Sequence, residues 1–312
     1  MIQLTESTYK TFGRCLTISN GSVEAVVTLD IGPRIIRFAK IGGENVMMED
    51  TEKSINQLEA ASEFADKFGA DKGVWYIYGG HRLWTSPEEL PRSYYPDNEP
   101  VIYEKVEGGA KFIPPVQGWT QYQMAITVTM SETENSLHIL HEITNTGAWS
   151  VEFAPWALSV LAPGGMEVMP MPQRKTGLLS NRKIVLWDYA RMNDNRVYWG
   201  DKYITLRQDT AAKEAFKLGI DSEHCWAAYF NHGDLFIKKF ESDPTGEYPD
   251  GGCNFETYTS KDFLEMESLG TLKSVAPGET VSHTEDWTLV ADVPCPACDE
   301  NEIAQVMEKY IS

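Results

Sequence analysis

The sequence is poor in basic residues. It has 27 lysines and arginines against 46 aspartates and glutamates, and its formal net charge at pH 7 is −19. Proteins that bind a nucleic-acid backbone need a basic surface, and so do proteins that bind an anionic membrane. The charge balance therefore argues against nucleic acid and against a membrane surface as partners.

The sequence also lacks a long apolar run and a rich set of cysteines. No stretch approaches the roughly 18 apolar residues of a membrane-spanning helix. The first ten residues, MIQLTESTYK, contain no basic segment followed by an apolar one, as a secretion signal would. Five cysteines are an odd number and do not resemble a disulfide framework. We therefore expect a soluble, cytoplasmic protein with reduced thiols.

Several common catalytic motifs are missing. The chain has no GxxxxGK[ST], no GxGxxG that opens a helix, no GxSxG and no HExxH, so nucleotide-binding and serine-hydrolase functions lose their usual support. The segment CPAC, from Cys295 to Cys298, has the spacing of half a zinc site or of a redox pair. Because the other three cysteines are scattered, a turn before the last helix is the favoured interpretation.

Short strand-like segments between turn residues make up most of the chain. Their density predicts an all-β sandwich or barrel. The 312 residues contain no internal repeat and no long linker, so we expect a single domain over residues 1–312. The clearest of these segments are SVEAVVTLD, GVWYIYGG, EPVIYEKVE, QYQMAITVTM, SLHILHEITN, VEFAPWALSV, KYITLRQ, CWAAYFN, LFIKKFE, FLEMESLG and VSHTEDWTLVAD.

Two segments have helical spacing instead. From Ser54 to Gly69 the apolar residues and the closing glycine predict a short helix inserted in a loop. Near the end of the chain, Asp299 precedes Glu302 by three residues, as in a capping box, and Ile303 begins an apolar face. We expect this C-terminal helix to pack on the sandwich.

The segment YGGHRLW combines two glycines with His81, Arg82 and Trp84. On a regular strand His81 and Arg82 point to opposite faces, so a bend at Gly79–Gly80 would be needed to bring both into one pocket. With the acidic, proline-rich loop that follows, the cluster has the groups that a sugar ring would need. The alternative is a structural histidine–arginine pair that binds loop carbonyls.

The segment FLEMESLG places two carboxylates on one strand face. Glu265 and Glu267 would alternate with Leu264 and Met266, roughly 6 to 7 Å apart. If that face lines a cleft, desolvation and mutual repulsion would raise at least one pKa and provide a general acid or base. If it faces water, the pair is an ordinary polar face.

Other polar candidates are weaker. His138 and His141 lie three residues apart on a predicted strand and diverge, so neither is assigned to a metal, and His141 is expected in a core or half-buried position. The loop EYPDGGCNFETYT carries Tyr248, Asp250 and Glu256 just before the paired carboxylates, and it could form the rim of a site.

Several stretches together resemble the galactose-mutarotase-like superfamily. ISNGSVEAVVTLDIGPRIIRFAKIGGENVM is similar to its opening hairpin, HEITNTGAWSVEFAPWAL to its strand with an asparagine turn, and FLEMESLGTLKSVAPGETVSHTEDW to the segment with its catalytic glutamate. GPRI, GGHRLW, YPDGGCNFETYT and FLEMESLG resemble a family of uncharacterised function within that superfamily. The resemblance implies a large antiparallel β-supersandwich.

The resemblance also implies roles for residues. In mutarotases a carboxylate takes the proton of the anomeric hydroxyl while a histidine protonates the ring oxygen. By position the base would be Glu265, with Glu267 as its rival. Arg82 would bind sugar hydroxyls, and Arg34 of GPRI and Trp84 would shape the pocket. The usual histidine after the asparagine turn is missing from TNTGAW, so His81 or His141 would have to supply the acid.

The expected function is therefore a mutarotase-type or related epimerase that acts on a free, uncharged sugar without a cofactor. A glycoside hydrolase or lyase is an alternative, although its two acids should come from different elements. A non-catalytic carbohydrate-binding protein is another. Tyr248 and Asp250 are expected to contact the sugar in either case, and nothing in the sequence predicts an oligomeric state.

Overall fold

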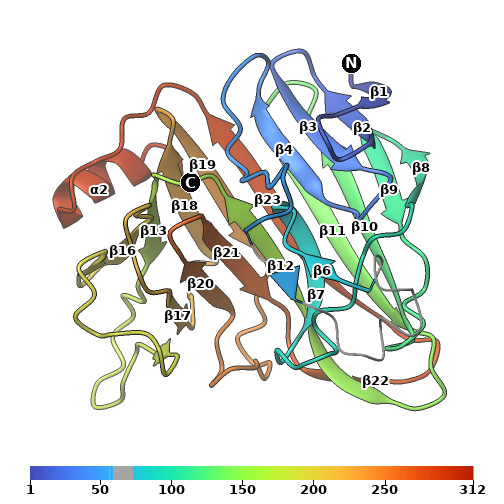
Figure 1. Cartoon of the computed structure of the whole chain (residues 1–312). Helices are drawn as coiled ribbons and strands as arrows, with labels where there is room; N and C mark the ends of the chain where they lie inside the picture. The colour runs from blue at the N-terminus through green and yellow to red at the C-terminus, as the bar shows by residue number, and fades with distance from the viewer. Residues whose placement is uncertain (56, 59–72, 312) are drawn as a thin grey trace.

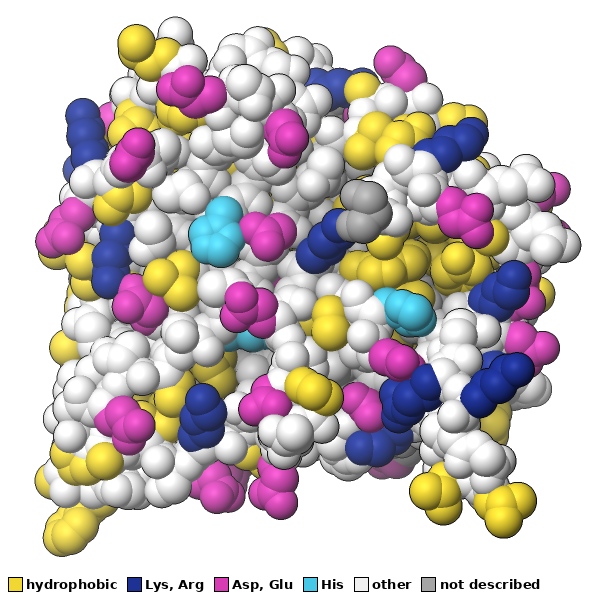
Figure 2. Space-filling model, turned by 180° about the vertical axis from the view of Figure 1, so that it is seen from behind, with side chains coloured by type: hydrophobic (Ala, Val, Ile, Leu, Met, Phe, Trp, Pro, Cys, Tyr) yellow, Lys and Arg dark blue, Asp and Glu magenta, His cyan; other side chains and the backbone are white. Residues whose placement is uncertain are grey.

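The computed structural model describes residues 1–55, 57–58 and 73–311. Two large sheets face each other as layers, and every strand pair among the described residues is antiparallel (Figure 1). The all-β sandwich expected from the sequence is confirmed. On the face shown in Figure 2, acidic and basic side chains are interspersed over the surface of this strongly acidic protein.

The first sheet has eleven strands, and its central strands carry the candidate site. The strands are, in spatial order, β1 (Gln3–Thr8), β2 (Arg14–Ser19), β3 (Val23–Thr28), β4 (Ile35–Lys40), β7 (Gly80–Ser86), β12 (Val151–Leu161), β21 (Leu264–Leu269), β20 (Phe255–Thr259), β17 (Phe216–Ile220) and β14 (Ile184–Leu186), with β22 (Lys273–Val275) paired to β12.

The second sheet has ten strands, and a separate pair completes the β structure. The ten are β15 (Val197–Trp199), β16 (Tyr203–Arg207), β13 (Met166–Pro170), β18 (Trp226–Asn231), β19 (Asp234–Phe240), β23 (Thr280–Val290), β11 (Ser136–Asn145), β10 (Tyr122–Met130), β9 (Gly109–Ile113) and β8 (Ile102–Val106). The separate pair is β5 (Gln57–Leu58) with β6 (Trp75–Tyr76).

The main core lies between the two sheets. Phe38 of the first sheet packs against Phe236 and Trp287 of the second, with ring centroids 6.3 and 6.0 Å away. These side chains belong to one continuous cluster of buried apolar residues contributed by both sheets. Burial of this apolar surface is the main favourable contribution to folding, at roughly 25 cal/mol per Å².

The predicted C-terminal helix is confirmed as α2 (Glu300–Met307). The side chain of Asp299 accepts hydrogen bonds from the backbone N–H groups of Asn301 and Glu302, which satisfies donors that the helix leaves free. Glu302 accepts from the backbone of Ala297 instead of closing the box on Asp299. Ile303 and Met307 join a small apolar cluster beside β13, β18 and β19.

The inserted helix expected from Ser54 to Gly69 falls mostly outside the described residues, which omit 56 and 59–72. Of the residues from Ser54 to Gly69 that are described, Gln57–Leu58 forms strand β5, which pairs with β6. These two residues are therefore not part of a helix. No helix in the described part of the chain has the length and apolar character needed to cross a membrane.

A sharp bend precedes β7, as the glycine pair predicts. Tyr78, Gly79 and Gly80 have φ angles of 52°, 94° and 65°. A Cβ atom on Gly79 would clash with the carbonyl oxygen of Met48, and one on Gly80 with that of Ile35. Only glycine fits both positions. The bend splits the predicted strand GVWYIYGG, and β7 then continues in regular extension to Ser86.

Candidate active site

A hollow of about 410 Å³ opens on the outer face of the eleven-stranded sheet, away from the core between the sheets. It combines aromatic side chains with two cations and three carboxylates, the composition of a site for a polar ring-shaped ligand. The main lining residues are Trp75, Arg82, Trp84, Glu88, Tyr94, Trp156, Trp187, Tyr189, Lys217, Tyr258, Phe263, Glu265 and Glu267.

The paired carboxylates of β21 lie in this hollow. Glu265 and Glu267 point to the same side of the strand, as their spacing predicts, and Phe263 lies with them. Their exposed fractions are only 7% and 1%, so the alternative of a water-facing polar strand does not apply. The indole N–H of Trp156 donates to Glu267 Oε2 at 3.0 Å, which orients that carboxyl group.

Each carboxylate of β21 has its own cation. Arg82 Nη1 donates to Glu265 Oε1 at 2.8 Å, and the guanidinium lies 4.2 Å from the ring centroid of Trp84. Lys217 Nζ lies 3.1 Å from Glu267 Oε2. Both cations are almost completely buried. Ion pairing and cation–π contacts, of Arg82 with Trp84 and of Lys217 with Trp156, hold them in place.

Burial shifts the pKa values of this group. Desolvation raises the pKa of Glu267 to about 7, against the opposing attraction of Lys217. Desolvation likewise raises the pKa of Glu256, the cross-strand neighbour of Glu267, to about 8. Burial alone would lower the pKa of Lys217, but the attraction of Glu267 and Glu256 outweighs it and raises that pKa well above its usual value. A carboxyl group that titrates near pH 7 suits proton transfer at neutral pH.

His81 does not reach the hollow, which corrects the expectation that it shares a pocket with Arg82. The bend at Gly79–Gly80 comes before the strand, and the ordinary alternation of β7 then sends His81 inward and Arg82 outward. His81 is fully buried between the sheets, where its Nε2 lies 2.7 Å from His141 Nε2 of the opposite sheet. His81 therefore cannot protonate a sugar in the hollow.

His141 is also part of the inner core and not of the hollow. It is fully buried, and its Nδ1 donates to the backbone carbonyl of His283 at 3.0 Å. Since this leaves the Nε2 of a neutral His141 as an acceptor, His81 Nε2 donates to it and His81 Nδ1 accepts from Ser159 Oγ at 2.9 Å. Desolvation lowers the pKa of His81 far below its usual value and that of His141 to about 3, so both rings are neutral.

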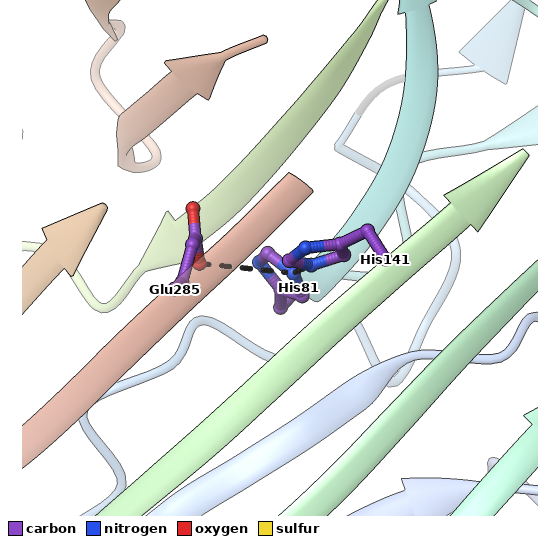
Figure 3. Close-up of side chains that lie close together, drawn as sticks. All are labelled: His81, His141 and Glu285. Carbon is purple, nitrogen blue, oxygen red and sulfur yellow. Dashed lines mark hydrogen bonds and ion pairs between the residues drawn. The ribbon is translucent and has the colours of Figure 1, made fainter. Parts of the chain in front are cut away.

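Figure 3 shows His81, His141 and Glu285 close together and pointing toward one another. Each offers one atom that could bind a metal ion, and these three atoms lie within 4.8 Å of one another. Three such groups can hold a metal ion, but here they satisfy each other and their neighbours. Glu285 accepts from Lys238 Nζ at 2.9 Å and from the indole of Trp287 at 2.8 Å. The Lys238 ammonium already neutralises the carboxylate and would repel a dication, so we interpret the group as a hydrogen-bonded core network.

The remaining predicted contact residues lie in different places. Trp84 lines the hollow. Arg34 is fully buried and does not line it, and its Nη2 lies 2.7 Å from Asp97 Oδ2. Tyr248 lines a separate surface groove, where its hydroxyl accepts from the backbone N–H of Asp243. Asp250 accepts from Ser86 Oγ at 3.0 Å. The structure thus brings together Arg82, Trp84 and the two glutamates, but not Arg34, Tyr248 or Asp250.

Sequence reasoning missed Lys217 and most of the aromatic lining. Lys217 stands in the apolar segment FKLGI, which forms β17, and a lysine inside such a strand is a signal of a paired, buried charge. Trp187 and Tyr189 follow the short strand β14 and reach the hollow only because β14 pairs with β17 at the end of the sheet. No periodic pattern in the sequence could have placed them there.

Solved structures with a similar fold support this description. A TPR-domain-containing protein from Parabacteroides distasonis matches 90% of this chain with a TM-score of 0.62 and 13% identity, and the chain spans about half of that protein, 48%. A protein assigned as a mutarotase from Salmonella typhimurium matches 92% of this chain and 94% of its own, with a TM-score of 0.59 and 10% identity.

A galactose mutarotase-like protein from Lactobacillus casei matches 88% of this chain and 99% of its own, with a TM-score of 0.54 and 11% identity. No family model matches the sequence, and no curated protein matches it. At these identities the likeness concerns the fold. The two facing antiparallel sheets and these neighbours together show that the chain shares the fold of these mutarotase-like structures.

Proposed function

We propose that this protein interconverts the anomers of a free, uncharged sugar by acid–base catalysis. The observation that carries the proposal is the pair Glu265 and Glu267, which enter one aromatic-lined hollow from the same strand, each with its own cation. The name of the Lactobacillus casei neighbour, a galactose mutarotase-like protein, supports a sugar as the ligand.

The two carboxyl groups can divide the chemistry between them. Glu265, ion-paired with Arg82, takes the proton of the anomeric hydroxyl. Glu267, whose pKa is about 7, gives its proton to the ring oxygen, and the bond between that oxygen and the anomeric carbon breaks. The new carbonyl group rotates, and the reverse proton transfers close the ring on its other face. Both protons return to their starting groups, so no cofactor is consumed.

The spacing of the two carboxyl groups fits this reaction. The hydroxyl oxygen and the ring oxygen are bonded to the same carbon, so the acid and the base must act on atoms very close together. Positions two apart on a strand lie roughly 6 to 7 Å from each other, which lets both carboxyl groups converge on one carbon. Glu267 therefore takes the role of the acid, which the sequence had suggested for His81.

The walls of the hollow fit an uncharged sugar ring. Indole and phenol faces such as those of Trp84, Tyr94 and Trp187 cover the apolar face of a ring, and the polar groups contact its hydroxyls. Both cations of the hollow already have carboxyl partners, Arg82 in Glu265 and Lys217 in Glu256 and Glu267. No unpaired positive charge is left among the lining residues to attract a phosphate or a carboxylate.

A non-catalytic sugar-binding protein is the second candidate. The ion pair between Arg82 and Glu265 favours this function, because the 2.8 Å contact occupies one oxygen of the carboxylate that would have to accept the proton. In that case the hollow would hold a sugar without moving its protons.

Anomer exchange measured by NMR over a panel of free sugars separates the two functions. We expect exchange with the wild-type protein and a loss of about 100-fold or more in Glu265→Gln and Glu267→Gln, because general acid–base groups contribute roughly 10² to 10⁴. Glu104→Gln, on the exposed strand β8, is the matched control and should exchange at the wild-type rate. Sugar binding without exchange in the wild-type protein would favour the binding function.

Two further features remain proposals. We propose that residues 1–312 form one domain, supported by the apolar cluster that both sheets share. We also propose a cytoplasmic location, supported by five cysteines that are all free.

A further inference from the structure

Three charged side chains from three neighbouring strands meet beside the hollow. Glu256 of β20 and Glu267 of β21 are direct cross-strand partners, an arrangement in which two like charges destabilise a sheet. Lys217 of β17 lies between them, with Nζ 2.8 Å from Glu256 Oε2 and 3.1 Å from Glu267 Oε2. All three are buried, with exposed fractions of 4% or less.

The surroundings hold this triad in one arrangement. The Lys217 ammonium lies 4.8 Å from the ring centroid of Trp156 and 4.6 Å from that of Trp187, so two indoles enclose it. Trp156 also donates to the same oxygen of Glu267 that Lys217 contacts. Gly219 is the cross-strand partner of Glu256, and a Cβ atom there would clash with Cys253 Sγ and lie 3.4 Å from Glu256 Cγ, so the glycine leaves room for both side chains.

Two of the three side chains of this triad face the hollow. Lys217 and Glu267 line the hollow, whereas Glu256 lies behind them and is not among its lining residues. A buried carboxyl group that reaches neither solvent nor the hollow costs free energy. Its position indicates that it acts on the lysine, which it holds beside Glu267 through the 2.8 Å contact between its Oε2 and the ammonium.

We propose that Lys217 and Glu256 are positioning residues for Glu267, which they hold in the orientation and protonation state of a proton donor. The proposal rests on the proposed function, because it assigns Glu267 the role of the acid. Lys217 acts through its contact with Glu267, and Glu256 acts through Lys217.

The electrostatics of the whole site supports different effects for the two positions. Lys217 and Arg82 lower the pKa of Glu267, whereas burial and Glu265 raise it. Removing the lysine charge should therefore raise this pKa further. Glu256, whose pKa is about 8, is mostly protonated at pH 7, so a neutral amide in its place should leave the pKa of Glu267 almost unchanged. The other titratable groups around the triad are Glu88, Tyr189 and Tyr258 in the hollow, and Asp250, Cys253, Glu167 and Lys238 outside it. They stay in place in all variants.

The test is the pH profile of kcat/KM for anomer exchange in Lys217→Met, Lys217→Arg and Glu256→Gln. The alkaline limb, near pH 7 in the wild-type protein, should move up by about one pH unit in Lys217→Met and stay within about 0.3 unit in Glu256→Gln, which keeps an oxygen beside the ammonium. Lys217→Arg should stay close to wild type. Lys111→Met, which breaks an ion pair with Glu142 far from the hollow, is the matched control and should not move the limb.

A second measurement does not depend on turnover. The infrared band of a protonated carboxyl group that disappears in Glu267→Gln reports the titration of Glu267 directly, and its titration should move to higher pH in Lys217→Met and stay in place in Glu256→Gln. If the wild-type protein exchanges no sugar, the proposed function fails, while this band still tests the positioning of Glu267. An unshifted titration in Lys217→Met, or a shift of about one pH unit in Glu256→Gln, would overturn the inference.

Discussion

The two faces of the central strands of the large sheet bury polar groups in different ways. On the outer face, Arg82, Lys217 and two glutamates of β21 form charged pairs inside a hollow of about 410 Å³. On the inner face, His81 meets His141 of the opposite sheet, and both rings are neutral and sealed between the sheets. Neighbouring residues of one strand thus place a charged group in an open hollow on one side and a neutral group in a closed core on the other.

The difference shows that burial alone does not identify a reactive group. His81 and Glu267 are both almost inaccessible. Burial drives the imidazole to its neutral form at any ordinary pH, whereas the neighbouring cation keeps Glu267 near the midpoint of its titration at neutral pH. What distinguishes the outer face is its opening to a hollow, since the inner side also holds a charged pair, Lys238 and Glu285.

The largest effect on anomer exchange should come from removing a charged group of the outer face. Arg82→Gln removes the partner of Glu265 and the stacked cation on Trp84, so we expect anomer exchange to fall by about 100-fold or more. NMR exchange rates measure this. Arg37→Gln breaks a comparable ion pair with Glu24 outside the hollow and should leave the rate unchanged. Equal losses in the two variants would contradict the assignment of the outer face.

Removing a hydrogen-bonded group of the inner face should lower the stability of the protein and leave catalysis unchanged. His81→Ala removes a buried ring and leaves His141 and Ser159 without their partner, so the free energy of unfolding should fall by about 2 to 4 kcal/mol. Denaturant titration gives this value. Exchange by the folded fraction should stay within about threefold of wild type. A stable His81→Ala protein that has lost exchange would restore His81 as a catalytic candidate.

The two faces should also give opposite pH dependences of stability. Burial lowers the pKa of His141 to about 3, so the folded state binds fewer protons than the unfolded state, and stability is lost as the pH falls from about 6.5 toward 3. Burial raises the pKa of Glu256 to about 8, so its protonated form favours folding below about pH 4.5, and this contribution is lost as the pH rises to 8.

Variants can separate the contributions of His141 and Glu256 to the pH dependence of stability. His141→Gln should flatten the acid side of the stability curve by about 1.4 kcal/mol per pH unit, and Glu256→Gln should flatten the alkaline side by a similar amount. Unfolding transitions between pH 4 and 9 measure both. His138→Gln, at an exposed ion pair with Asp286, is the control for the acid side. A flattening on the wrong side in either variant would contradict the assigned ionisation states.

The smallest effect is expected at Tyr248, which the sequence placed among the sugar contacts. Tyr248→Phe removes hydrogen bonds to Ser242 and Asp243 and should cost about 1 kcal/mol or less of unfolding free energy. Exchange rates and KM should match the wild type, because the residue lines another groove. A raised KM would show that the sugar extends beyond the hollow.

Much of the fold could be predicted because it depends on local patterns. The strand-like segments matched long strands such as β10, β11 and β12, and the capping signal at Asp299 located α2. The segment GVWYIYGG was wrong as one strand, because three consecutive positive φ angles from Tyr78 to Gly80 break it. Strand β17 was missed, since a lysine within five residues hides its apolar character.

The sequence by itself determined that Glu265 and Glu267 share one face of a strand, because side chains on a strand alternate with a period of two. It equally determined that His81 and Arg82 diverge wherever β7 is regular. Only the tertiary structure decided which face is sealed by the second sheet and which is open, and only it brought Lys217 between Glu256 and Glu267. These contacts join strands far apart in the chain, and no local pattern encodes such a pairing.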